Sequence, residues 1–205
     1  MSVISGLINN GDIIISADTL LAHLSNAEKS KHGFNKIFRF TLKPNTYIIA
    51  TGGLGEHVGK FLDIIQKQPF PVSIDKASLF VDELQNILLA NKLDKITLLV
   101  AGVEDDHNLL ARVKMNEKQI KNKEGDYSIS LPDSANNNLA DIQKVFNNNV
   151  NLLPDDPLKL LTIVQKKVAE IDENRFVNTD FYYSILRSDG SVVAPELSKD
   201  GYKMK

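Results

Sequence analysis

The spacing of apolar residues changes in blocks along this chain, and the order of the blocks constrains the fold more than any other feature. Two apolar runs, Val3–Ile8 and Ile13–Ile15, flank Asn10-Gly11, which is a strong β-hairpin signal. The runs at 36–40 and 47–50 predict a second strand pair. The chain therefore begins with four strands.

Helical spacing then follows over 58–65 and 81–88, strands return over 96–131, and a second helical block covers 139–171. A closing hairpin is turned at Asp189-Gly190. Separate blocks of antiparallel strands and helix pairs favour an α+β fold over a parallel sheet. We predict one domain over residues 1–205, a four-layer αββα sandwich with two sheets inside and helices outside.

Local signals refine this prediction. Ile13–Ile15 are apolar at consecutive positions, so their strand is expected to be buried on both faces. Asp75 is a candidate helix N-cap, and Asp156-Pro157 suits a helix start. The polar residues 116–126 predict an exposed loop.

Composition limits the classes of function. Lys and Arg number 24 against 26 Asp and Glu, so charge gives no reason to expect a nucleic-acid or membrane-surface partner. The absence of cysteine excludes a disulfide, a thiolate metal site and a Cys nucleophile. There is no signal-like start and no apolar run of membrane-spanning length. We expect a cytoplasmic protein without metal or cofactor.

Ser2 becomes the terminal residue if Met1 is removed. A terminal serine holds a hydroxyl nucleophile and a free amine, whose ordinary pKa of about 7.7–8.0 suits a base near neutral pH. Taken alone, a serine after the first methionine is unremarkable.

Two charged residues and a glycine pair add to this pattern. Asp18 ends the second strand and Lys36 begins the third, where they form either a structural ion pair or part of a site. Gly52-Gly53 lies between a strand and a helix. Its amides suit an oxyanion hole, although a turn with positive φ explains the glycines equally well.

These residues recur in one family in this order. The chain resembles proteasome β-subunits and, more closely, the bacterial proteasome-like peptidase that works with a ring-shaped ATPase. The family aspartate lies sixteen residues after the nucleophile, as Asp18 does after Ser2. The family lysine opens the third strand as in Lys36-Ile37, and Gly52 corresponds to the glycine whose amide binds the oxyanion.

The resemblance implies an N-terminal-nucleophile hydrolase fold, with Ser in place of the usual Thr. It also implies a peptide or small amide substrate, a homo-oligomer, with a ring as one form, and an ATPase as a candidate partner. The family's auxiliary serine corresponds to Ser130 or Ser134, and its supporting aspartate to Asp172 or to the position of Asn174. Two alternatives stay open: a non-catalytic structural subunit, and an amidase or acyl-transferase of the same fold.

Overall fold

A computed structural model describes most of the chain. The described residues are 2–20, 34–42, 45–67, 70, 74, 76–104, 107–132, 137–172 and 177–198. The predictions made for Asp75, Ser134 and Asn174 fall outside these residues.

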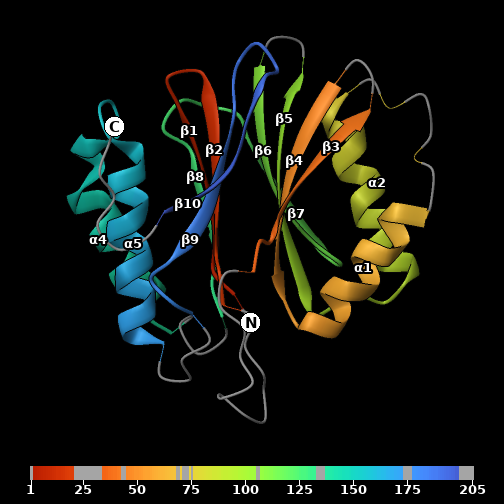
Figure 1. Ribbon diagram of the computed structural model, residues 1–205, viewed down its shortest axis with the longest axis horizontal. Helices are drawn as coiled ribbons and strands as arrows, with labels where there is room; N and C mark the ends of the chain where they lie inside the picture. The colour runs from red at the N-terminus through yellow and green to blue at the C-terminus, as the bar shows by residue number, and fades with distance from the viewer. Residues whose placement is uncertain are drawn as a thin grey trace.

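Two five-stranded antiparallel sheets form the centre of the protein (Figure 1). The first sheet has the order β10-β9-β2-β1-β8 and contains β1 (Ile4–Asn9), β2 (Asp12–Asp18), β8 (Tyr127–Ser130), β9 (Phe181–Leu186) and β10 (Val192–Ser198). The second has the order β3-β4-β5-β6-β7 and contains β3 (Ile37–Leu42), β4 (Asn45–Gly53), β5 (Ile96–Glu104), β6 (His107–Lys114) and β7 (Glu117–Lys121).

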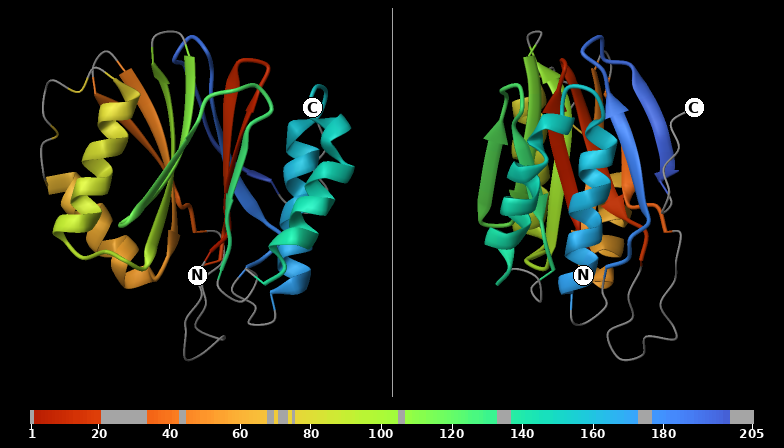
Figure 2. Two further views of the ribbon diagram at one scale, coloured as in Figure 1. Left: turned by 180° about the vertical axis from the view of Figure 1, so that it is seen from behind. Right: turned by 90° about the vertical axis from the view of Figure 1, so that its left-hand side faces the viewer.

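Helices cover the outer face of each sheet (Figure 2). The first sheet is covered by α4 (Leu139–Asn148) and α5 (Pro157–Ile171), which are joined through the short 3₁₀ helix η2 (Val150–Leu152). The second sheet is covered by α1 (Gly55–Lys67) and α2 (Ala77–Ala90). The predicted α+β sandwich with four layers is confirmed. No described helix combines the length and the apolar character that crossing a bilayer requires.

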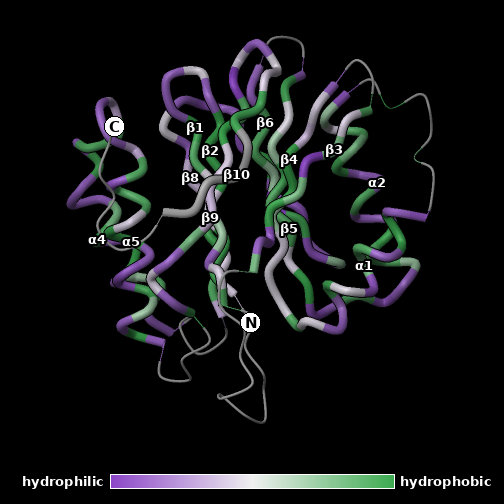
Figure 3. Tube along the Cα trace, viewed as in Figure 1, coloured by the Kyte–Doolittle hydropathy of each residue, from purple (hydrophilic) through white to green (hydrophobic). Residues whose placement is uncertain are grey.

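The apolar core lies in three layers, one between the sheets and one under each helix pair. In Figure 3 the hydrophobic residues concentrate on the central strands. The strand β2 shows why its apolar run is continuous: Ile13 and Ile15 point into the layer between the sheets, whereas Ile14 packs under α4 and α5. The prediction that Ile13–Ile15 are buried on both faces of the strand is therefore confirmed.

The first hairpin has the predicted turn. Asn10 and Gly11 have φ angles of 52° and 75°, as a two-residue type I′ turn requires. The helix start predicted at Asp156-Pro157 is also confirmed, because Pro157 opens α5 and the Asp156 carboxylate accepts the amide of Lys159 at 3.0 Å.

One local prediction needs correction. The segment 116–126 is not all loop, because Glu117–Lys121 forms β7 and pairs with β6. Its residues show no apolar alternation since β7 is an exposed edge strand held by main-chain hydrogen bonds.

The layer between the sheets should dominate stability. Ile15 is fully buried there, so Ile15→Ala is expected to lower the free energy of unfolding by about 2–5 kcal/mol. Leu79→Ala is the control, because Leu79 is 45% exposed on α2 and its loss should change stability by less than about 0.5 kcal/mol. Urea denaturation of both variants measures the difference, and equal losses would contradict this core assignment.

Candidate active site

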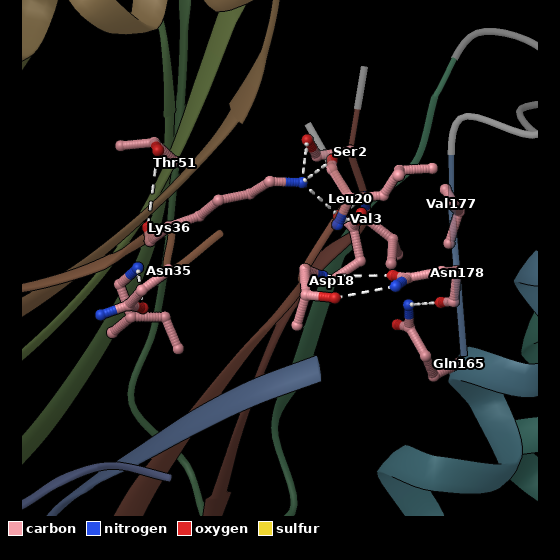
Figure 4. Close-up of polar contacts among 12 residues, drawn as sticks. Ser2, Val3, Asp18, Leu20, Asn35, Lys36, Thr51, Gln165, Val177 and Asn178 are labelled. Carbon is pink, nitrogen blue, oxygen red and sulfur yellow. Dashed lines mark hydrogen bonds and ion pairs between the residues drawn. The ribbon is translucent and has the colours of Figure 1, made fainter. Parts of the chain in front are cut away.

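Three predicted residues meet at one end of the sandwich, between the two sheets (Figure 4). Ser2 precedes β1, Asp18 is the last residue of β2, and Lys36 directly precedes β3. The Nζ of Lys36 lies 2.8 Å from Oγ of Ser2 and 2.9 Å from Oδ1 of Asp18. Side chains from three segments therefore form one hydrogen-bonded group.

The hairpin register explains why Asp18 lies beside Ser2. The tight turn sets Ile4 opposite Ala17, so Asp18 faces Val3, the neighbour of Ser2. The amide of Asp18 donates to the Val3 carbonyl at 3.1 Å, and the Asp18 carboxylate accepts the Val3 amide at 3.0 Å. The sixteen-residue spacing seen in the sequence is thus a consequence of strand pairing.

Lys36 reaches the group from the second sheet. Its backbone carbonyl accepts the Thr51 amide at 3.0 Å, which anchors it beside β4. Its Nζ also donates to the carbonyl of Leu20 at 2.6 Å. A charged ammonium has three hydrogens, and here each has an oxygen to receive it. Ser2 Oγ therefore accepts a hydrogen bond from a cation and keeps its own proton available to a base.

Both charges of the pair are removed from water. Asp18 is 0% exposed and Lys36 is 3% exposed. Burial raises the pKa of Asp18 and lowers the pKa of Lys36, and the attraction between the two charges opposes both shifts. The amides of Val3 and Leu20 also stabilise the carboxylate form of Asp18. Burial thus weakens the hold of Lys36 on its proton, and the adjacent carboxylate of Asp18 counteracts that loss.

Gly52 lies inside β4, opposite Thr97 of β5, and lines a cavity of about 480 Å³ that also contains Ser2. The amide of Leu54 donates to Lys95, so by antiparallel alternation the Gly52 amide points towards β5. The amide of Gly53 lies on the opposite side, facing the β3 edge. Gly53 is therefore a second candidate for the oxyanion donor, beside Gly52, which the family resemblance selected.

Glycine is required at position 53 itself. Its φ is +133°, and a Cβ there would lie 2.1 Å from the carbonyl oxygen of Lys95. The chain can therefore pass this close to β5 only without a side chain.

Two candidates for the family's auxiliary residues, Ser130 and Asp172, lie within the described residues, at two different places. Ser130 ends β8 and lines the same cavity as Ser2. Asp172 follows the last turn of α5, is 3% exposed, and accepts the amide of Val177 at 2.8 Å. It holds the start of the segment that leads to β9.

Asn178 belongs to a buried polar network that the sequence analysis missed. Its side chain accepts the Thr19 amide at 3.2 Å and donates to the Thr19 hydroxyl at 2.7 Å, beside Asp18 (Figure 4). Gln165 donates to the Asn178 carbonyl at 2.7 Å. The available signal was Gln165, a polar residue on the apolar stripe of α5 between Val164 and Val168.

The group formed by Ser2, Asp18 and Lys36 offers no imidazole and no thiolate to a metal. The described residues include no cluster of three or more metal-ligating side chains. The arrangement is a hydroxyl, a buried lysine and a buried carboxylate. Such a group polarises the hydroxyl and stabilises negative charge that develops on its oxygen.

Comparison with solved structures gives matches over almost the whole chain. Anbu, the ancestral beta-subunit, from Yersinia bercovieri superposes with a TM-score of 0.73 at 10% identity, covering 98% of this chain and 88% of that one. Anbu from Hyphomicrobium sp. strain MC1 gives 0.72 at 9% identity, with 96% and 87% covered. The chain has a proteasome-like fold.

A third solved structure is the helical assembly of the Anbu complex from Pseudomonas aeruginosa, with a TM-score of 0.71, 11% identity, and 98% and 88% of the two chains covered. No protein-family profile and no curated protein sequence matches the chain. At sequence identities of 9–11%, the similarity to these solved structures shows the fold alone. The chemistry must be argued from this chain's own residues.

The ion pair generates a stability prediction. Asp18→Asn keeps the shape of the side chain but leaves Lys36 buried without its counter-charge, so we expect a loss of about 3–5 kcal/mol in the free energy of unfolding. The double variant Asp18→Asn/Lys36→Met removes both charges and should recover part of that loss. Chemical denaturation of Asp18→Asn, of Lys36→Met and of the double variant measures the three losses. A double variant that loses the sum of the two single losses would show that the charges do not interact.

Proposed function

We propose that this protein is an N-terminal-nucleophile hydrolase that cleaves peptide or amide bonds, with Ser2 as the nucleophile after removal of Met1. The observation that carries the proposal is the 2.8 Å hydrogen bond from the buried Lys36 ammonium to Oγ of Ser2. The hydroxyl that accepts this hydrogen bond also lines a cavity of about 480 Å³, so the polarised oxygen borders space for a substrate.

The first half of the reaction forms an ester. The terminal amine of Ser2 takes the hydroxyl proton, directly or through water, and Oγ attacks the carbonyl carbon of the scissile bond. The negative charge moves to the carbonyl oxygen, where the amide of Gly53 binds it, because the Gly52 amide points into the ladder between β4 and β5. The carbon–nitrogen bond then breaks, the protonated amine of Ser2 gives its proton to the leaving amine, and an acyl ester remains on Ser2.

The second half releases the acid. The free amine of Ser2 takes a proton from water, the resulting hydroxide attacks the ester, and Oγ leaves with the proton. Lys36 stays positively charged throughout because Asp18 lies 2.9 Å away, and its charge favours the ionised oxygen of Ser2 in both steps. An acceptor other than water at this step would make the protein an acyl-transferase of the same fold.

A covalent inhibitor tests the proposal. The protein lacking Met1 is incubated with a peptide epoxyketone, which requires both the hydroxyl and the amine of a terminal residue, and the adduct is located by mass spectrometry. We expect one adduct on Ser2. Ser2→Thr keeps a hydroxyl and should still be labelled, whereas Ser2→Ala should not.

Lys36 has its own expected effect on this labelling. Lys36→Met leaves the Ser2 hydroxyl in place but removes the cation that stabilises its ionised form, so the labelling rate should fall by about 10²–10³-fold. Absence of labelling in the protein without Met1, with Ser2→Ala indistinguishable from it in peptide cleavage, would favour the non-catalytic structural subunit.

We further propose that the chain self-associates. The support is the assembled state of the Pseudomonas aeruginosa Anbu complex, whose subunit superposes on 98% of this chain. Light scattering of the purified protein is expected to give a mass that is a multiple of 22.8 kDa, and a monomer at all concentrations would contradict self-association. A ring and an ATPase partner rest on the family resemblance alone.

A further inference from the structure

The cavity at Ser2 continues past the nucleophile along β8. On that side it is lined by Ile129 and Ser130 of β8 and by the following Leu131 and Pro132. A second cavity of about 440 Å³ adjoins it and shares three lining residues, which are Arg112, Ile129 and Leu139. Together the two cavities extend the space at Ser2 well beyond the size of one side chain.

The strand β8 has an outer edge facing this space. On that edge the Tyr127 carbonyl already accepts a hydrogen bond from Nζ of Lys121, and the main chain of Ile129 pairs with no other described strand. Within the part of the chain that the structure describes, β8 pairs only with β1.

The Ile8 amide donates to the Asp126 carbonyl, so alternation directs the main chain of Ser128 and Ser130 towards β1. The N–H and C=O of Ile129 therefore point outward, and Ile129 lines both cavities. A strand edge that pairs with no other strand binds an extended peptide by main-chain hydrogen bonds.

Basic side chains of β6 lie across the cavity from this edge. Arg112 and Lys114 are two residues apart on the strand, so they project from the same face. Both contact one carboxylate, that of Glu117, with N–O distances of 2.7 Å and 3.9 Å. Because Arg112 and Lys114 share the single carboxylate of Glu117, this side of the cavity carries one unbalanced positive charge. The other charged residues that line the Ser2 cavity, Asp94 and Lys95, offset each other.

Arg112 also has an unused donor. Its Nε is buried and makes no hydrogen bond to any described residue. A buried N–H without an acceptor is unfavourable, whereas a carboxylate that accepts from Nε and from one Nη of the same guanidinium would satisfy it and neutralise the spare charge. Arg112 lies where the two cavities meet, beside the outer edge of β8.

We propose that the Ser2 cavity binds its substrate as an extended peptide along the outer edge of β8, with an acidic side chain of that peptide held by Arg112. This proposal names the substrate class for the function proposed above. Its claim that the bound peptide is cleaved rests on that function. Binding itself does not, because none of the recognition groups is Ser2.

The binding experiment uses the Ser2→Ala protein, so that no peptide is consumed. Fluorescence anisotropy is measured with labelled nonapeptides that carry one Glu, placed at each position in turn, and with matched peptides that carry Gln instead. We expect at least one Glu peptide to bind about 10–100-fold more tightly than its Gln counterpart, because charge-assisted hydrogen bonds are roughly this much stronger than neutral ones. Equal affinities at every position, or no saturable binding of any Glu peptide, would overturn the proposal.

Three variants assign the effect to its residues. Arg112→Gln should abolish the preference for Glu over Gln. Glu117→Gln should increase it several-fold, because Arg112 then has no competing carboxylate. Arg39→Gln removes the same charge from an exposed position on β3 and should leave the preference unchanged. A preference that survives Arg112→Gln would show that another group recognises the acid.

The strand edge is tested through the peptide backbone. A set of peptides with one N-methylated amide each, at successive positions, should include at least one that binds ten or more times more weakly. If all N-methylated peptides bind as well as the parent, the edge of β8 is not the binding surface. Labelling of Ser2 by the epoxyketone is scored separately, so labelling without a Glu preference defeats only this inference, and a Glu preference without labelling defeats only the hydrolase proposal.

Discussion

The buried ion pair between Lys36 and Asp18 is the interaction on which the candidate site depends. Removing two charges from water disfavours the folded state by several kcal/mol for each ion, unless their hydrogen bonds are all replaced. Here the replacement is nearly complete: Nζ of Lys36 donates to three oxygens, and the carboxylate of Asp18 also accepts two backbone amides. One of those three oxygens is Oγ of Ser2. The same contacts that make the pair tolerable thus place a cation on the hydroxyl.

The fold holds Asp18 and Lys36 in position by different means. The β1–β2 hairpin holds Asp18 beside Val3 through the shortest possible connection, so this distance hardly depends on the rest of the molecule. Lys36 arrives from the other sheet and depends on packing of the layer between the sheets. The segment before β9 adds a third attachment, since Asn178 binds Thr19 next to the carboxylate. A loss of sheet packing would therefore disturb the lysine before it disturbs the aspartate.

Local signals predicted well wherever a short stretch of chain decides its own conformation. The Asn10-Gly11 turn and the helix start at Asp156-Pro157 need no distant partner, and both were predicted from residue type alone. The strand Glu117–Lys121 was missed because an exposed edge strand is held by its neighbour's backbone, which leaves no alternation in its side chains. Asn178 was missed for a related reason: its partner Thr19 lies 159 residues away in the sequence.

The sequence by itself determined the order of the strand and helix blocks, the four-layer α+β arrangement and the first hairpin, which brings Asp18 beside Val3. These follow from hydrophobic periodicity and from a turn whose residues, Asn10 and Gly11, readily adopt the positive φ angles that the turn requires. Only the tertiary structure decided that Lys36 hydrogen-bonds to Ser2, that the Gly53 amide faces the β3 edge, and that Arg112 lies beside the outer edge of β8. Each of these depends on strand register or on the packing of two sheets, which are properties of contacts between distant segments and leave no signal within any one of them.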